Sequence, residues 1–114
     1  MKITELLEKT GWEVLAGDPA SSPDAEGVYC GDLLSWVMGR AEEGNAWLTI
    51  MSNQNVAAVA VMVDLSCIVL TEGVRPDGQL LERAKAEQLN LLGTSMSTYE
   101  AAAAFAGIEQ QSIS

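Results

Sequence analysis

The chemistry open to this chain is limited first by what it lacks, because its 114 residues include no histidine. Histidine is the usual general base near neutral pH and the commonest metal ligand, so one chain cannot assemble a Ser-His or Cys-His nucleophile. The two cysteines, Cys30 and Cys67, are too far apart in sequence to suggest a zinc site. Neither a P-loop nor a Gly-x-Gly-x-x-Gly motif occurs. We therefore expect no self-sufficient enzyme, no metal and no cofactor.

Carboxylates are the groups that remain for acid–base chemistry or for holding Mg²⁺. Asp32, Asp64 and Glu72 each lie near the end of a predicted strand or helix. Each also has an ordinary structural explanation: Asp32 can cap a helix, Asp64 ends one, and Glu72 belongs to a turn. A carboxylate enzyme acting with Mg²⁺ is the weakest interpretation, and we predict no catalytic residue.

Three polar clusters follow apolar segments, and they hold the residues best suited to bind a ligand. They are Asn53-Gln54-Asn55, Thr71-Glu72-Gly73 and Thr94-Ser95. Each cluster precedes a helix-like stretch, whose first N–H groups and dipole attract small anions such as nucleotides or phosphorylated metabolites. Helix capping is the competing explanation for the asparagine and Thr-Ser clusters.

The alternation of apolar segment, polar cluster and helix-like stretch predicts an α/β domain with a mostly parallel sheet. The expected strands are residues 12–15, 28–30, 46–51, 67–70 and 89–92. The expected helices begin near Ile3, Asp32, Val56, Asp77 and Ser97. Flanking helices on both faces make this a single three-layer domain of about five strands. The carboxyl ends of parallel strands share one edge, so the three clusters should meet there.

The domain spans residues 1–114 and divides into three parts. Residues 1–26 supply a helix, a strand and a loop, residues 27–107 form the core, and residues 108–114 are a frayed tail after a helix stop at Gly107. Cys30 and Cys67 lie in predicted strands, where buried thiols behave as small apolar groups. A disulfide between neighbouring strands is the alternative.

Six basic and sixteen acidic residues give a net charge of −10. This charge repels nucleic acid and anionic membranes and mainly promotes solubility, although small anionic ligands stay possible at helix starts. The chain opens on an amphipathic stretch rather than a secretory signal. Its longest apolar run, residues 56–63, is far shorter than the roughly 20 residues of a membrane span. The expected compartment is the cytoplasm.

The helix over residues 56–63 is apolar on all sides, which is unusual for a helix that covers a sheet. Such a helix is either central in the domain or buried against a second subunit. We predict a homodimer whose interface includes Val56, Val59 and Val63.

Three segments carry a resemblance to a known family: residues 31–38 (GDLLSWVM), residues 67–77 (CIVLTEGVRPD) and residues 91–100 (LLGTSMSTYE). From residue 28 to residue 99 the chain resembles the DRTGG domain family and, more distantly, the N-terminal domain of the HPr serine kinases. The letters D-R-T-G-G are absent, and Asn53-Gln54-Asn55 stands where that motif would begin. The kinase P-loop is also missing.

The resemblance implies an accessory α/β domain like the N-terminal domain of HPr kinases. In relatives this domain is joined to phosphotransacetylases, CBS-containing pyrophosphatases or HPr kinases, and it is regulatory or dimerising. We therefore interpret the chain as a non-catalytic regulatory or protein-interaction domain that dimerises, with a possible partner protein in a metabolic enzyme or kinase system. A module that senses a small nucleotide or phosphorylated metabolite is the alternative.

Overall fold

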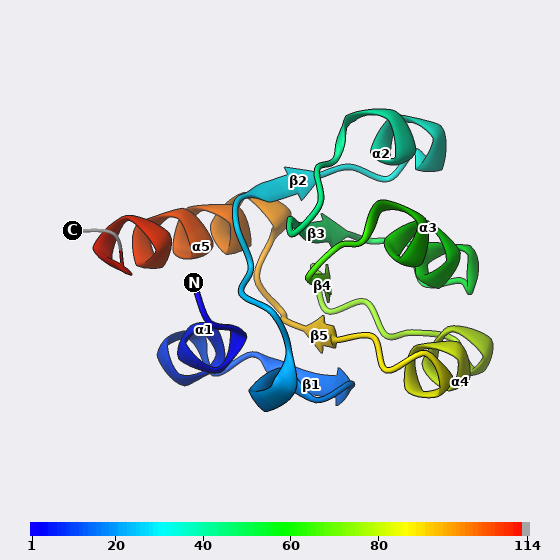
Figure 1. Cartoon of the computed structure of the whole chain (residues 1–114), viewed down its shortest axis with the longest axis horizontal. Helices are drawn as coiled ribbons and strands as arrows, with labels where there is room; N and C mark the ends of the chain where they lie inside the picture. Colours follow the sequence, from blue (N-terminus) through cyan, green and yellow to red (C-terminus); the bar gives the residue numbers. More distant parts are fainter. Residues whose placement is uncertain (113–114) are drawn as a thin grey trace.

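The computed structural model describes residues 1–112, and within them five strands form one sheet in the order β1-β5-β4-β3-β2 (Figure 1). The strands are β1 (Glu13–Ala16), β2 (Val28–Cys30), β3 (Ala46–Thr49), β4 (Cys67–Leu70) and β5 (Leu91–Gly93). Strands β2 to β5 are mutually parallel, whereas β1 pairs antiparallel with β5. The predicted mostly parallel α/β sheet is confirmed.

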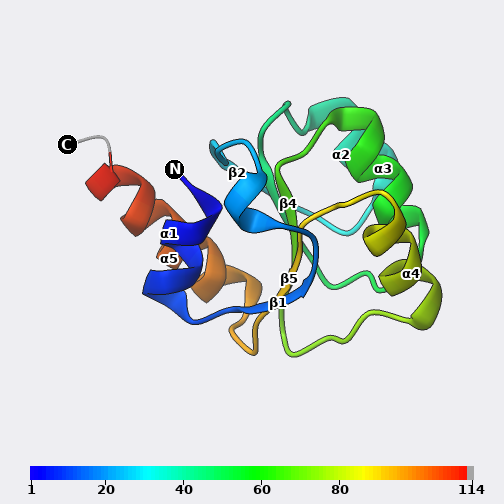
Figure 2. The same ribbon diagram turned by 60° about the horizontal axis from the view of Figure 1, so that its bottom comes forward.

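Helices cover both faces of this sheet (Figures 1 and 2). They are α1 (Ile3–Thr10), α2 (Leu34–Arg40), α3 (Asn55–Val63), α4 (Gly78–Ala86) and α5 (Thr98–Ser112), with a short 3-10 helix, η1 (Pro19–Ser21). Helices α2, α3 and α4 connect successive parallel strands and lie side by side on one face, while α1 and α5 cover the other. The predicted three-layer arrangement is therefore confirmed.

Each face of the sheet has its own apolar core. Along β4, Ile68 and Leu70 pack toward α2, α3 and α4, while Cys67 and Val69 pack toward α1 and α5. All four side chains are buried. A strand covered on both faces must be apolar throughout, which explains the unbroken run of apolar residues in β4.

Helix α5 begins as predicted but ends later. The Glu100 N–H donates to Ser97 Oγ at 3.1 Å and the Ser97 N–H donates to Glu100 Oε1 at 3.0 Å, a capping box. The helix passes Gly107 and continues to Ser112, so the predicted frayed tail is wrong for residues 108–112. Ile108 packs against the core beneath α1 and α5, which holds this last part in place. Residues 113–114 lie outside the described part of the chain.

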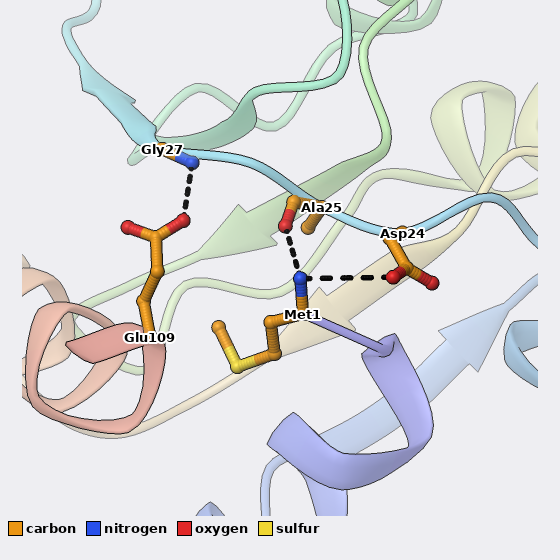
Figure 3. Close-up of polar contacts among 5 residues, drawn as sticks. All are labelled: Met1, Asp24, Ala25, Gly27 and Glu109. Atoms are coloured by element: carbon orange, nitrogen blue, oxygen red, sulfur yellow. Dashed lines mark hydrogen bonds and ion pairs between the residues drawn. The ribbon is translucent and has the colours of Figure 1, made fainter. Parts of the chain in front are cut away.

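Met1 and Glu109, near opposite ends of the chain, both form hydrogen bonds with the segment that leads into β2 (Figure 3). Glu109 Oε2 accepts a hydrogen bond of 2.7 Å from the Gly27 N–H. The Met1 ammonium donates to the Ala25 carbonyl at 2.9 Å and lies 3.8 Å from Asp24 Oδ2. The segment from residue 24 to residue 27 is thus held against α1 and α5.

Two local predictions near β2 are corrected. Asp32 does not cap α2: its Oδ1 accepts hydrogen bonds from Thr49 Oγ1 at 2.7 Å and from the Ile50 N–H at 2.9 Å. This side chain engages the end of β3, which stops at Thr49. Cys67 is buried as expected, but Cys30 on the edge strand is exposed, and both thiols are free.

Candidate functional site

The loops that follow β4 and β5 are joined by backbone hydrogen bonds at the carboxyl edge of the sheet. The Glu72 N–H donates to the Met96 carbonyl at 2.7 Å, and the Gly73 N–H donates to the Thr94 carbonyl at 2.9 Å. Glu72 and Gly73 both adopt left-handed backbone conformations, with φ of 61° and 73°, which turn the first loop toward the second. The structure therefore brings two of the three predicted clusters together.

Within the first of these clusters, Thr71 and Glu72 are engaged with the start of α5. Thr71 is fully buried, and its Oγ1 lies 2.7 Å from Thr98 Oγ1. Glu72 Oε2 accepts a hydrogen bond of 3.2 Å from the Thr98 N–H, where the helix dipole favours a negative charge. These two side chains hold the loop and the helix together.

The asparagine cluster does not join the other two. Asn53, Gln54 and Asn55 are exposed, and Asn53 Oδ1 accepts a local hydrogen bond of 2.9 Å from the Asn55 N–H. The adjoining Ser52 carbonyl accepts from the Asp77 N–H at 3.0 Å, which ties this loop to the one before α4. None of the three residues belongs to the lining of the cavity that the loops after β4 and β5 form.

A cavity of about 390 Å³ lies where these two loops meet the end of α1 and the start of β1. Three residues predicted from the sequence, Gly73, Thr94 and Ser95, line it. The rest of the lining is Thr10, Gly11, Trp12, Glu13, Val74, Arg75, Gly93 and Met96. Sequence reasoning missed these because β1 runs antiparallel beside β5, which brings its first residues to the carboxyl edge. Arg75, two residues after the Thr71-Glu72-Gly73 cluster, was a signal that the sequence offered.

An ion pair at the cavity joins β1 to the loop after β4. Arg75 Nη1 donates to Glu13 Oε2 at 2.6 Å, and the two side chains are 64% and 57% exposed. The hydrogen bond and charge of Arg75 hold the pKa of Glu13 below its usual value, and Glu13 raises the pKa of Arg75 in return. Because water screens a pair this exposed, it contributes little to folding.

Two polar groups on residues that line the cavity differ in their hydrogen bonding. Thr94 Oγ1 accepts from the Met96 N–H at 3.1 Å. Trp12 is 6% exposed, and its buried indole N–H has no hydrogen-bond acceptor within residues 1–112. A buried donor without an acceptor is destabilising, so this indole N–H costs stability in the core that Trp12 shares with α1 and α5.

The carboxylates considered for Mg²⁺ chemistry are not brought together. Asp32 and Glu72 are engaged with Thr49 and Thr98, whereas Asp64 ends α3 at the opposite edge of the sheet. Over residues 1–112 no group of three or more Cys, Asp or Glu side chains is arranged to hold a metal ion. No helix in that part of the chain is long and apolar enough to cross a membrane.

The apolar helix α3 lies between α2 and α4, as the middle helix of its layer. Val56 and Val59 face the core and are 0% and 4% exposed, so predicting them at an interface is wrong. Val63 is half-buried and packs against the same core. The water-facing side of α3 instead carries Val61 and Met62, which are 48% and 68% exposed.

Comparisons with known proteins agree with this fold. The family model of the DRTGG domain matches residues 5–108, which confirms the resemblance inferred from the sequence. No curated protein matches the chain. A similar solved structure contains the CBS and DRTGG domains of the regulatory region of Clostridium perfringens pyrophosphatase, complexed with its activator diadenosine tetraphosphate. The likeness has a TM-score of 0.70 at 16% identity and covers 88% of this chain but only 44% of the other.

Proposed function

We propose that this chain, which belongs to the DRTGG domain family, is a non-catalytic regulatory domain that acts as a homodimer. The similar solved structure is itself part of a regulatory region, which supports a regulatory role here. The lack of histidine and the dispersal of the carboxylates support a function without catalysis. We place the domain in the cytoplasm. We expect no nucleic-acid partner, because the net charge of −10 repels a phosphate backbone.

The observation that carries this proposal is the apolar surface of α2 and α3. Trp36 on α2 is 52% exposed, and Val61 and Met62 on α3 are 48% and 68% exposed. The two helices are neighbours in one layer (Figure 1). The Arg40 guanidinium lies 3.7 Å from the centre of the Trp36 ring, which leaves the other face of the indole for a partner. Exposed apolar side chains on neighbouring helices are typical of interaction surfaces, which supports a second copy binding here.

Sedimentation velocity or light scattering at micromolar concentration tests the homodimer. We expect the unmodified chain to have the mass of two copies and Met62→Glu to have the mass of one. Tyr99→Glu is the matched control, because Tyr99 is 82% exposed but lies on α5, on the other face of the sheet. Circular dichroism should show both variants folded. A single-copy mass for the unmodified chain would refute dimerisation.

Sensing of a small ligand is the second candidate function, and the cavity beside Arg75 supports it. Its volume of about 390 Å³ lies within the range of small-molecule sites. Segments far apart in the sequence form its wall, so a ligand bound there would stabilise their packing. The similar pyrophosphatase region binds a nucleotide activator, although that structure also contains CBS domains.

A thermal-shift screen with adenine nucleotides, acetyl phosphate and sugar phosphates tests the second candidate. We expect a saturable rise in Tm with at least one compound. Ser95→Asp should abolish the rise, because it adds a negative charge to the cavity lining. Asn53→Asp adds the same charge on an exposed loop outside the cavity and should leave the rise intact. No shift across the panel would argue against sensing.

A further inference from the structure

The cavity beside Arg75 contains one basic and one acidic side chain in its lining, and these two are bonded to each other. Arg75 extends from the loop after β4, and Glu13 is the first residue of β1. Both side chains are mostly exposed, so exchanging one carboxylate partner for another is inexpensive for the arginine. The guanidinium can present two parallel N–H groups to any planar oxyanion.

The rest of the lining favours a ligand that accepts hydrogen bonds. Ser95, in the loop after β5, is exposed and contributes a hydroxyl to this lining. At Gly11 and Gly73 no heavy atom lies within 4 Å of the position a Cβ would take, so a ligand can approach their backbone closely. Arg75 and Ser95 thus supply side-chain donors to a ligand in this cavity.

A second cavity has an acidic lining, so its charge can be compared with that of the cavity beside Arg75. It has a volume of about 280 Å³, lies near the starts of β4 and β5, and is lined by Asp24, Glu43 and Asp64 without any lysine or arginine. An anion would be repelled there. In a chain of net charge −10, the cavity beside Arg75 is the better place for a negatively charged ligand.

We infer that the cavity beside Arg75 binds a small oxyanion, a phosphate or carboxylate group, and that Glu13 is a built-in competitor which this anion displaces from Arg75. The inference rests on the ligand-sensing function proposed above and adds the class of ligand and its control. Displacing Glu13 breaks the side-chain contact between the start of β1 and the loop after β4. Anion binding is thereby coupled to the contact between these two segments. Glutamate is ionised in the neutral range, and Arg75 lowers the pKa of Glu13 further, so Glu13 competes as a carboxylate there.

Isothermal titration calorimetry at constant ionic strength tests the inference with inorganic phosphate, pyrophosphate and succinate as probes. Glu13→Gln should bind the preferred probe about two- to fivefold more tightly, the effect expected from removing an exposed ion-pair partner. Arg75→Gln should weaken binding about tenfold or more, because charge-assisted hydrogen bonds are lost. Glu87→Gln is the matched control: Glu87 pairs with Arg83 on α4, away from this cavity.

The outcomes separate this inference from the function on which it rests. Tighter binding by Glu13→Gln alone supports the competitor role, and preference for phosphates or for succinate identifies the source of the oxyanion. Binding that Arg75→Gln removes but Glu13→Gln leaves unchanged overturns the competitor role and keeps ligand sensing. Equal tightening by Glu87→Gln reveals a general charge effect and also overturns it. Absence of binding by both the unmodified chain and Glu13→Gln overturns the oxyanion site, while the thermal-shift panel still tests sensing independently.

Discussion

The hydroxyl pair of Thr71 and Thr98 gives a quantitative test of how the loop after β4 is fastened to α5. The two Oγ1 atoms are 2.7 Å apart, Thr71 is fully buried, and Thr98 is half-buried. Replacing either threonine by valine keeps the branched shape and removes the hydroxyl. The two single variants should not be equivalent, because they leave different groups without a partner.

In Thr71→Val the surviving hydroxyl belongs to Thr98, which water can reach, so the loss is that of one ordinary hydrogen bond, about 0.5–1.5 kcal/mol. In Thr98→Val the surviving hydroxyl is that of Thr71, which is sealed from water. An unsatisfied buried hydroxyl costs about 1–3 kcal/mol. The double variant leaves neither hydroxyl and replaces the pair by apolar groups of similar shape, so it should be more stable than Thr98→Val alone.

Urea unfolding of the four proteins, all at one chain concentration, measures these differences. We expect Thr98→Val to be the least stable, with equal m values across the set. Valine and threonine have similar helix propensities, so the backbone of α5 is not the cause. A Thr98→Val variant as stable as Thr71→Val, or a double variant whose loss equals the sum of the two single losses, would refute the assignment of this pair as a buried hydrogen bond.

Three further predictions follow from burial and backbone geometry. Gly17→Ala should lower the free energy of unfolding in urea by about 2 kcal/mol or more, because Gly17 has φ of 99° and a Cβ would lie 2.6 Å from Asn90 Oδ1. Gly39→Ala on α2 is the control: nothing lies within 4 Å of its Cβ position, so it should raise the free energy of unfolding by about 0.5–1 kcal/mol. Ellman's reagent should titrate the exposed Cys30 thiol in the native protein and the Cys67 thiol only after unfolding. Burial raises the pKa of Cys67 from 9.0 to about 12, so the unfolded thiol ionises first as pH rises above 9. Between pH 9.0 and about pH 12, ionisation of Cys67 in the unfolded chain should lower the free energy of unfolding by about 1.4 kcal/mol per pH unit. The Cys67→Ala variant should not show this pH-dependent loss.

The general architecture could be predicted because its signals are local and strong. β4 is apolar at all four positions, which is expected only of a strand covered on both faces. Ser97 and Glu100 have the spacing of a capping box, and they form one. Each signal involves residues close together in sequence, so one sequence was enough to find it.

Local sequence patterns gave wrong predictions where a contact with a residue far away in the sequence determines the structure. Asp32 has the chemistry and position of a helix cap, but Thr49 on the neighbouring strand offers its hydroxyl instead. Gly107 suggests a helix end, yet Ile108 packs into the core and Glu109 bonds to Gly27, 82 residues away. The position of β1 beside β5 has no local signature, so Glu13 could not be linked to Arg75 from the sequence.

The predicted site divides into residues that build the carboxyl edge and residues that face the cavity. Thr71 and Glu72 are bonded to the start of α5, and these bonds set the path of the loop that carries Arg75. Changes at Thr71 would therefore alter ligand binding through the stability of the loop, whereas changes at Glu13 would alter it through charge. A Thr71 variant that weakened anion binding would also lower Tm in the absence of anion. A Glu13 variant would change affinity while Tm stayed nearly constant, since an exposed ion pair adds little to folding.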